Sequence, residues 1–163
     1  MIQIPPMLSL RPIEDKSEIA AFMVGTWGST RMMVAMQVYD VMAIEATGLY
    51  DAENKLVAFA SWALRDKTAY LCALHALVEG KSYARHLLAA LMPVLKDKGA
   101  RTIRAMITND NMPALTFYQK NGFRFATLYV GGVDAYRPTM PGMRTHGYQD
   151  IPIRDALELE MIL

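Results

Sequence analysis

Residues 79–85, with the sequence EGKSYAR, stand where a short apolar strand gives way to a basic stretch that forms a helix. Such junctions can bind phosphate groups, because the first amides of a helix have no acceptor within the helix. Loops of this kind usually carry several glycines, which let the backbone approach the anion closely. This loop has only Gly80, followed by Ser82 and Ala84. Two interpretations stay open: a phosphate-binding loop, or the plain start of a core helix whose dipole is favoured by Glu79.

A second stretch with chemical potential is TNDNMPALTFYQKNGF, residues 108–123. Asn111 is a suitable N-cap and Gly122 a suitable end for a short helix. The two phenylalanines of this stretch are explained by a core. A core does not also require Tyr118, Lys120 and Gly122 at these offsets. The pattern therefore indicates that this helix has a role beyond packing.

The hydrophobic periodicity predicts the elements that position these residues. We expect strands over residues 7–13, 48–50, 55–64, 68–77, 101–108, 123–130 and 156–163, and helices over 15–27, 82–98 and 109–123. Residues 28–47 are expected to form a strand or loop that runs into a helical turn near 42–46. Residues 131–152 are expected to be irregular. The order predicts an α+β protein around one central sheet.

Length and composition limit the classes of function. A chain of 163 residues with 53% hydrophobic and 20% charged residues predicts one globular domain over 1–163. The apolar runs are too short to span a bilayer, and no secretory signal pattern opens the chain, so a cytoplasmic location is expected. The net charge of +1 gives no general attraction to nucleic acid or to membranes. A single cysteine and three scattered histidines predict no disulfide and no metal site.

The two stretches together resemble the GCN5-related N-acetyltransferase (GNAT) superfamily, as a bacterial single-domain member. The first resembles the acyl-CoA loop, usually Q/R-x-x-G-x-G/A, with Glu79 at the Gln/Arg position, Ser82 in place of the first glycine, and Ala84 allowed. The second resembles the segment N-x-x-A-x-x-F/L-Y-x-K-x-G-F, through Asn111, Ala114, Phe117, Tyr118, Lys120, Gly122 and Phe123. The likeness covers roughly residues 7–130 in the order of elements, with its motifs confined to residues 74–123.

The resemblance implies the GNAT-like acyl-CoA N-acyltransferase fold: a mixed, mostly antiparallel sheet flanked by helices, with two splayed strands in the middle. It also implies acetyl-CoA as the cosubstrate. The residues that would bind acetyl-CoA are Leu74, Ala76, Glu79, Gly80, Lys81, Ser82, Tyr83, Ala84, Arg85, Asn111, Ala114, Phe117 and Tyr118. Because the carboxylate of Glu79 would repel a pyrophosphate, the cationic Lys81 and Arg85 and the nearby His86 would have to offset it.

The same resemblance assigns two catalytic roles. An amine attacks the thioester directly, and a backbone N–H near Leu74 donates to the developing oxyanion. Tyr118 is the general acid that protonates the departing thiolate. A buried aromatic residue with a hydrogen-bonded hydroxyl is the alternative for Tyr118.

The general base is left open by the sequence. Some relatives use a glutamate early in the strand before the loop, but Thr68 occupies that position here and cannot serve. The remaining candidates are Asp40, Glu45, His75 and His146. His75 has a suitable ordinary pKa, although a lone histidine in a strand is more often structural.

Three further features concern the acceptor and the acyl group. Cys72 allows an acetyl-cysteine route in principle, but a small buried hydrophobe is favoured. The 13 methionines include a cluster over 32–42 and others in the irregular tail, and are either core or an adaptable acceptor pocket. Trp27 and tyrosines could join that pocket. Arg137, Arg144 and His146 either bind an anionic acceptor or are solvated.

The expected function is therefore acetyl transfer from acetyl-CoA to a primary amine of a small molecule or peptide, through a ternary complex. One alternative is a GNAT-fold protein without catalysis that senses a ligand or binds a partner, and another is an unrelated α+β binding domain. A homodimer through the C-terminal strand, residues 156–163, is a further expectation from the family.

Overall fold

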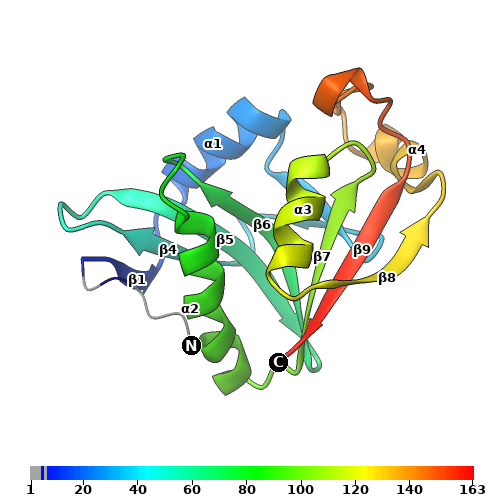
Figure 1. Ribbon diagram of the computed structural model, residues 1–163. Coiled ribbons are helices and arrows are strands. Elements are labelled where there is room, and N and C mark those ends of the chain that lie inside the picture. Colours follow the sequence, from blue (N-terminus) through cyan, green and yellow to red (C-terminus); the bar gives the residue numbers. More distant parts are fainter. Residues whose placement is uncertain (1–4, 6) are drawn as a thin grey trace.

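The structure is a computed structural model that describes residue 5 and residues 7–163. In this part of the chain a seven-stranded sheet has the order β1-β4-β5-β6-β7-β9-β8 (Figure 1). Its strands are β1 (Ser9–Pro12), β4 (Glu45–Tyr50), β5 (Leu56–Arg65), β6 (Thr68–Ala76), β7 (Thr102–Thr108), β8 (Arg124–Tyr129) and β9 (Ala156–Ile162). Neighbouring strands are antiparallel except β6 and β7, which are parallel. The mixed, mostly antiparallel sheet confirms the expected fold class.

Helices cover both faces of this sheet. The helices α2 (Tyr83–Asp97) and α3 (Met112–Lys120) lie on one face, and α1 (Ser17–Trp27) packs on the other (Figure 1). The crossover between the parallel strands β6 and β7 is α2, which buries Leu87, Leu88, Leu91 and Leu95 at the spacing that the sequence predicts. In the described residues, no helix is long and apolar enough to cross a membrane.

The segment between α1 and the sheet differs from its prediction. Residues 31–40 form a separate hairpin of β2 (Arg31–Val34) and β3 (Gln37–Asp40), and β4 already begins at Glu45, where a helical turn was expected. The two turn residues, Ala35 and Met36, have φ of 51° and 58°. Such turns normally use Asn or Gly, so neither residue marks this hairpin in the sequence.

Between β8 and β9 the chain forms only short elements, in agreement with the irregular segment predicted over residues 131–152. It contains α4 (Gly132–Tyr136) and the 3₁₀ turns η1 (Arg137–Thr139) and η2 (Tyr148–Asp150). The final strand β9 is hydrogen-bonded to β7 on one side and to β8 on the other. It therefore has no free edge to pair with a second copy of the chain, contrary to the route expected for a homodimer. The edge on this side of the sheet is β8.

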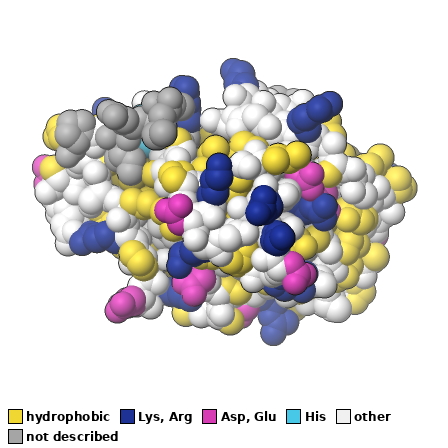
Figure 2. All heavy atoms as spheres, turned by 90° about the horizontal axis from the view of Figure 1, so that it is seen from below, with side chains coloured by type: hydrophobic (Ala, Val, Ile, Leu, Met, Phe, Trp, Pro, Cys, Tyr) yellow, Lys and Arg dark blue, Asp and Glu magenta, His cyan; other side chains and the backbone are white. Residues whose placement is uncertain are grey.

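Charged side chains of both signs are interspersed with hydrophobic ones at the end of the molecule that carries the C-terminal end of α2 (Figure 2). The chain has 17 basic and 16 acidic residues, so a mixed surface is what its composition leads one to expect.

One charge in β9 lies inside the protein. Leu157, Leu159 and Met161 of β9 pack toward α2 and α3, as the alternation predicts. Glu158 points to the opposite face and is only 1% exposed. Its carboxylate accepts a hydrogen bond from the Tyr129 hydroxyl (2.7 Å) and pairs with Arg104 Nη1 (3.4 Å). The carboxylate of Glu158 is buried, whereas its counter-ion Arg104 keeps 39% of its side chain exposed and also binds Glu160 (2.8 Å). These contacts tie β7, β8 and β9 together.

Replacing Arg104 by Met should lower the free energy of unfolding by about 2 kcal/mol, because Glu158 then stays buried without a cation. Adding Glu158→Gln to that variant should restore part of the loss, since a neutral amide needs no counter-charge. Urea unfolding of the single and double variants measures both effects. Arg124→Met, at an exposed site on β8, is the control, and an equal loss there would contradict the role given to Arg104.

Candidate active site

The site begins at an interruption between the two parallel strands. The pairing of β6 with β7 runs from Thr68 to Leu71 and stops there. A register shift in the pairing of β6 with β5 leaves Cys72 of β6 without a partner, because Ser61 pairs with Ala73 and Trp62 with Leu71. A bulge of this kind bends its strand. Beyond it, β6 and β7 diverge (Figure 1), so the splayed strands expected from the fold class are confirmed.

Past the bulge, β6 has unpaired backbone groups on the side of β7. The Leu77 amide donates to the Val57 carbonyl (2.8 Å), so residues 73, 75 and 77 direct their backbone groups toward β5. Successive residues of a strand point these groups in opposite directions. The N–H and C=O groups of Leu74 and Ala76 therefore face the opening, where an extended ligand can add to the edge.

The loop after β6 uses two left-handed residues to enter α2. Gly80 has φ of 75°, and Ser82, the residue before the helix, has φ of 56° and ψ of 27°. Ser82 thus adopts the conformation that a glycine adopts without cost. Its side chain makes no capping hydrogen bond. The first amides of α2, from Tyr83 to Arg85, are therefore free to bind an anion.

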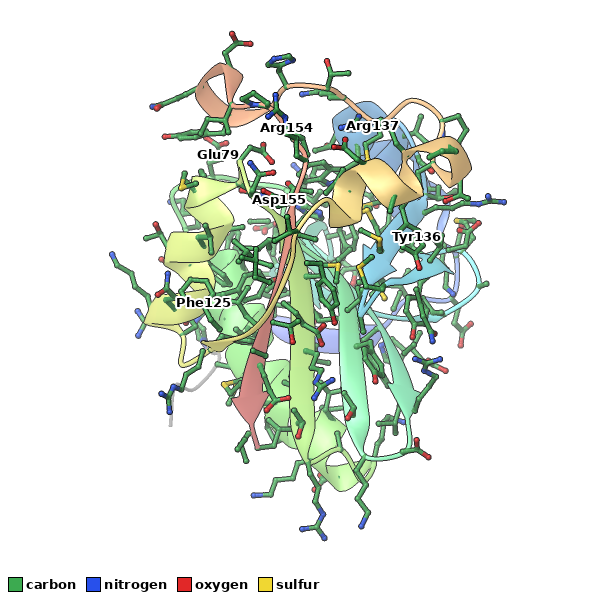
Figure 3. All side chains as sticks on the ribbon, turned by 90° about the vertical axis from the view of Figure 1, so that its right-hand side faces the viewer. Glu79, Phe125, Tyr136, Arg137, Arg154 and Asp155 are labelled. Carbon is green, nitrogen blue, oxygen red and sulfur yellow. The ribbon has the colours of Figure 1, made fainter. Side chains whose placement is uncertain are left out.

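The charges predicted around this loop are all at the surface. Lys81 and Arg85 are exposed, and so is Glu79, which lies at the same end of the molecule as the 131–155 segment (Figure 3). The carboxylate thus stands beside the free amides, with two cations next to it in sequence.

Helix α3 brings the second motif to the same opening. Asn111 caps the helix through its side-chain oxygen, which accepts from the Ala114 amide (3.2 Å). Tyr118 is buried, at 8% exposure, between Phe117 and Phe123, whose ring centres are 5.4 and 4.9 Å away. Burial raises the pKa of the Tyr118 phenol above its ordinary value, so the hydroxyl keeps its proton at neutral pH.

A cavity of about 620 Å³ passes through the opening between β6 and β7. On the side of α2 and α3 its wall includes six residues predicted for the site, namely Leu74, Ala84, Asn111, Ala114, Phe117 and Tyr118. The other predicted residues, Ala76 and most of the loop from Glu79 to Arg85, lie outside the wall. On the far side the wall is mainly apolar and includes Trp27, Met32, Met33, Met140, Met143 and Tyr148.

Only one of the four candidate bases reaches this cavity. Asp40 accepts from the Met42 amide in the turn after β3, Glu45 starts β4, and His146 is exposed beside Pro152. His75 does line the cavity. Its Nε2 accepts a hydrogen bond from Trp27 Nε1 (3.1 Å), and burial lowers its pKa to about 4. It is neutral at pH 7, and its acceptor nitrogen is already used to hold Trp27.

The buried acid that the sequence did not point out is Asp110, at the end of β7. It is 6% exposed and lines the cavity. Its carboxylate accepts from the Thr108 hydroxyl and from the Tyr148 amide (3.0 Å). A side chain at Gly147 would place Cβ 1.8 Å from Asp110 Oδ2, so a glycine is needed for this approach. In the sequence Asp110 lies between two asparagines in a run of residue types that cap helices, so no pattern marked it as a buried acid.

The residue before it, Asn109, fixes the 131–155 segment over the open end of the sheet. The side-chain oxygen of Asn109 accepts from the amides of Arg154 (2.9 Å) and Asp155 (3.0 Å), and its nitrogen donates to the Pro152 carbonyl (2.9 Å). Asp155 in turn accepts from the Gly131 amide (2.7 Å). The tripeptide 109–111 therefore positions the upper wall of the cavity, the buried acid and the start of α3.

Two side chains of the 131–155 segment hold that segment in place. Tyr136 and Arg137 lie above the ends of the central strands (Figure 3). The Tyr136 hydroxyl donates to the Met36 carbonyl, which joins α4 to the β2–β3 hairpin. Arg137 donates to the carbonyls of residues 143, 144 and 153. Its guanidinium is thus occupied, which leaves Arg144 as the arginine of this segment that lines the cavity.

Cys72 is poorly suited to act as a nucleophile. Burial raises the pKa of the Cys72 thiol to about 12, and Sγ contacts the Tyr70 carbonyl at 3.5 Å. The thiolate that a nucleophile requires is therefore disfavoured. Across residues 5 and 7–163, no group of three or more His, Cys, Asp or Glu side chains is arranged to hold a metal ion.

A sheet opened between two parallel strands, with free amides at the following helix, is the architecture of an acyl-CoA N-acyltransferase. The model of the acetyltransferase (GNAT) family matches residues 16–123, and the chain belongs to this family. The uncharacterized protein YxbD of Bacillus subtilis is 28% identical over 144 residues, which are 88% of this chain and 91% of that protein.

Solved structures share the fold at lower identity. An IAA acetyltransferase from Bacillus cereus has a TM-score of 0.73 and 15% identity, over 96% of this chain and 99% of that one. An acetyltransferase of Bacillus subtilis in complex with CoA has a TM-score of 0.71 and 16% identity, over the same shares.

The pKa of His75 predicts an acid-dependent loss of stability. The unfolded chain takes up a proton near pH 6.5, but the folded protein only near pH 4, so the free energy of unfolding falls as the pH drops between these values. His75→Gln should flatten the fall of the melting temperature between pH 7 and pH 5. His146→Gln, at an exposed site, should not change it. An unaltered slope in His75→Gln would refute the buried neutral state.

Proposed function

We propose that the protein is an acetyl-CoA-dependent N-acetyltransferase that transfers the acetyl group to a primary amine by direct attack in a ternary complex. The observation that carries this proposal is the single cavity through the opening of the sheet. It is lined by the splayed strand and Tyr118 toward α2 and α3, and by an apolar wall toward the 131–155 segment. Two substrates can thus enter from opposite faces and meet in one space.

The residues around the opening suit a CoA thioester, which supplies the activated acetyl group when bound. The backbone groups of Leu74 and Ala76 can pair with the amides of the pantetheine arm as an added strand would. The free amides at the start of α2 can bind the pyrophosphate, with Lys81 and Arg85 offsetting Glu79. Solved structures of the same fold in complex with CoA and with acetyl-CoA bound support acetyl-CoA as the cosubstrate.

The catalytic roles follow from the same positions. The amine nitrogen forms a bond to the thioester carbon, and the Leu74 N–H donates to the carbonyl oxygen as it becomes negative. The C–S bond then breaks, and Tyr118 gives its proton to the departing sulfur. The nitrogen loses a proton to solvent as it becomes an amide, and solvent returns a proton to the Tyr118 oxygen. The raised pKa of Tyr118 suits a donor that must be protonated at neutral pH. Because the Cys72 thiol is also held protonated, direct attack is favoured over an acetyl-cysteine.

A second function keeps the fold and loses the chemistry: a GNAT-fold module that senses a ligand or binds a partner. The observation that favours it is Glu79, an exposed carboxylate beside the amides that would bind pyrophosphate.

Tyr118→Phe should separate the two functions. An enzyme should lose about 10²-fold or more in kcat, because the leaving sulfur has no proton donor, while its affinity for acetyl-CoA stays within about twofold. Release of the CoA thiol and calorimetric titration measure the two quantities. A wild-type protein that binds acetyl-CoA but turns over no amine would support the sensing module and refute the enzyme.

Substitutions at Ser82 test the loop. Ser82→Gly should raise the free energy of unfolding by about 1 kcal/mol, because glycine removes the cost of the left-handed conformation. It should not weaken acetyl-CoA binding.

Ser82→Asp should instead weaken acetyl-CoA binding, since it places a second carboxylate next to the pyrophosphate site. Calorimetric titration with acetyl-CoA, with desulfo-CoA and ADP as comparison ligands, measures the affinities. Equal affinity in the Asp and Gly variants would show that the phosphates bind elsewhere.

A further inference from the structure

We propose that the amine acceptor is a small zwitterion, in which an apolar body carries both the primary ammonium group and an anionic group such as a carboxylate. This inference rests on the proposed acetyl transfer and names the substrate class of the same cavity. Three parts of the wall carry it: one buried acid, two arginines at the rim, and the apolar surface between them.

Asp110 is the group that binds the ammonium. Its carboxylate is 6% exposed and lines the cavity, and its hydrogen bonds come from a hydroxyl and a backbone amide, which are neutral donors. Among the residues that the structure describes, no Lys, Arg or His forms an ion pair with it. A buried carboxylate without a counter-charge is costly. An ammonium group in the cavity supplies that charge, and Asp110 can then take the proton that the nitrogen must lose before it attacks.

Two arginines mark the place of the anionic group. Arg31 and Arg144 both line the cavity and are exposed. Arg144 Nη2 reaches the Thr26 carbonyl at 3.5 Å, which places it beside the junction of α1 and β2, where Arg31 begins the strand. In the described residues neither arginine is ion-paired. Guanidinium groups suit carboxylates and other planar or tetrahedral anions.

The surface between these charges is apolar and adaptable. It includes Met32, Met33, Met140 and Met143, together with Trp27. Methionine side chains adjust to irregular ligands. His75, which holds Trp27, is neutral and adds no further charge to the wall. The body of the acceptor is thus expected to be hydrophobic.

The way in which the wall closes favours a small acceptor over a polypeptide. The α1–β2 junction and the 131–155 segment touch at Gly28 and Gly142, which have φ of 76° and 89°. A Cβ built on Gly28 would lie 3.3 Å from the Gly142 carbonyl oxygen. The two backbones therefore meet over the acceptor side and limit its width.

Matched acceptors test the charge requirement. Leucine, methionine and phenylalanine are each compared with their methyl ester, which lacks the negative charge, and with the amine left by removal of the carboxyl group. The readout is CoA thiol release with acetyl-CoA. In at least one trio, kcat/KM of the zwitterion should exceed that of both partners by tenfold or more.

Three variants and one control locate the charges. Arg31→Gln and Arg144→Gln should each reduce the preference for the zwitterion over its ester by about tenfold, and Arg124→Gln, on the distant edge strand, should leave it unchanged. Asp110→Asn should lower kcat/KM for the amino acid and the neutral amine alike by tenfold or more. Its acetyl-CoA affinity and melting temperature should stay close to those of the wild type.

The outcomes separate this inference from the proposed function. If no zwitterion exceeds its ester and its amine while the protein still binds acetyl-CoA, the acceptor class is wrong and the donor site stands. If the protein does not bind acetyl-CoA, the proposed function itself fails. A zwitterion preference that survives both arginine substitutions would overturn the place given to the anionic group.

Discussion

The end of pairing between β6 and β7 is the constraint on which the site depends. One extra residue in β6, Cys72, removes the register that would have kept the two strands together. An intact ladder would satisfy the backbone groups of Leu74 and Ala76 and close the space between the strands with backbone hydrogen bonds. The bulge leaves a central strand with the properties of an edge, in the interior of a sheet where an edge is protected from other proteins. A ligand then takes the place of the missing neighbour.

A few polar residues at the end of β7 hold the two walls of the cavity in place. Asn109, Asp110 and Asn111 are adjacent in sequence, yet each fixes a different stretch: residues 152–155, the chain at Tyr148, and the first turn of α3. Each uses hydrogen bonds from backbone amides, which are directional and short. Residues 109–111 thus fix the position of the acceptor side relative to the donor side. The cavity keeps its shape although residues 131–155 above it form no long helix or strand.

Much of the fold was predictable because its signals are local. The periodicity of α2, the caps of α3 and the alternation in β9 each determine an element from a few neighbouring residues. The β2–β3 hairpin was missed because its turn uses Ala35 and Met36, which carry no turn signal. Glu158 and Asp110 were missed for another reason. Whether a carboxylate is buried depends on partners such as Arg104 and Tyr148, which lie 54 and 38 residues away in the chain.

The site residues also divide into those that local sequence patterns indicate and those that only the fold brings together. The loop and the α3 motif are contiguous in sequence, so a pattern could indicate Tyr118 and the free amides of α2. The acceptor wall is assembled from α1, the hairpin and the 131–155 segment, and its charges meet only in three dimensions. The candidate bases taken from the sequence were accordingly scattered, and three of the four lie away from the cavity.

The position of the 131–155 segment has a consequence for how such a protein can change. The segment is a loop closed at its base by the antiparallel pair Tyr129 and Ala156, the last step of the β8–β9 ladder. Residues can be added to or removed from a loop of this kind without shifting the strands, and doubling its length costs only about 0.6 kcal/mol in closure entropy. One part of the cavity wall can therefore change in length and sequence while the sheet that carries it keeps its strands in place, so that selection for a new acceptor can act on one stretch of chain and leave the donor side intact.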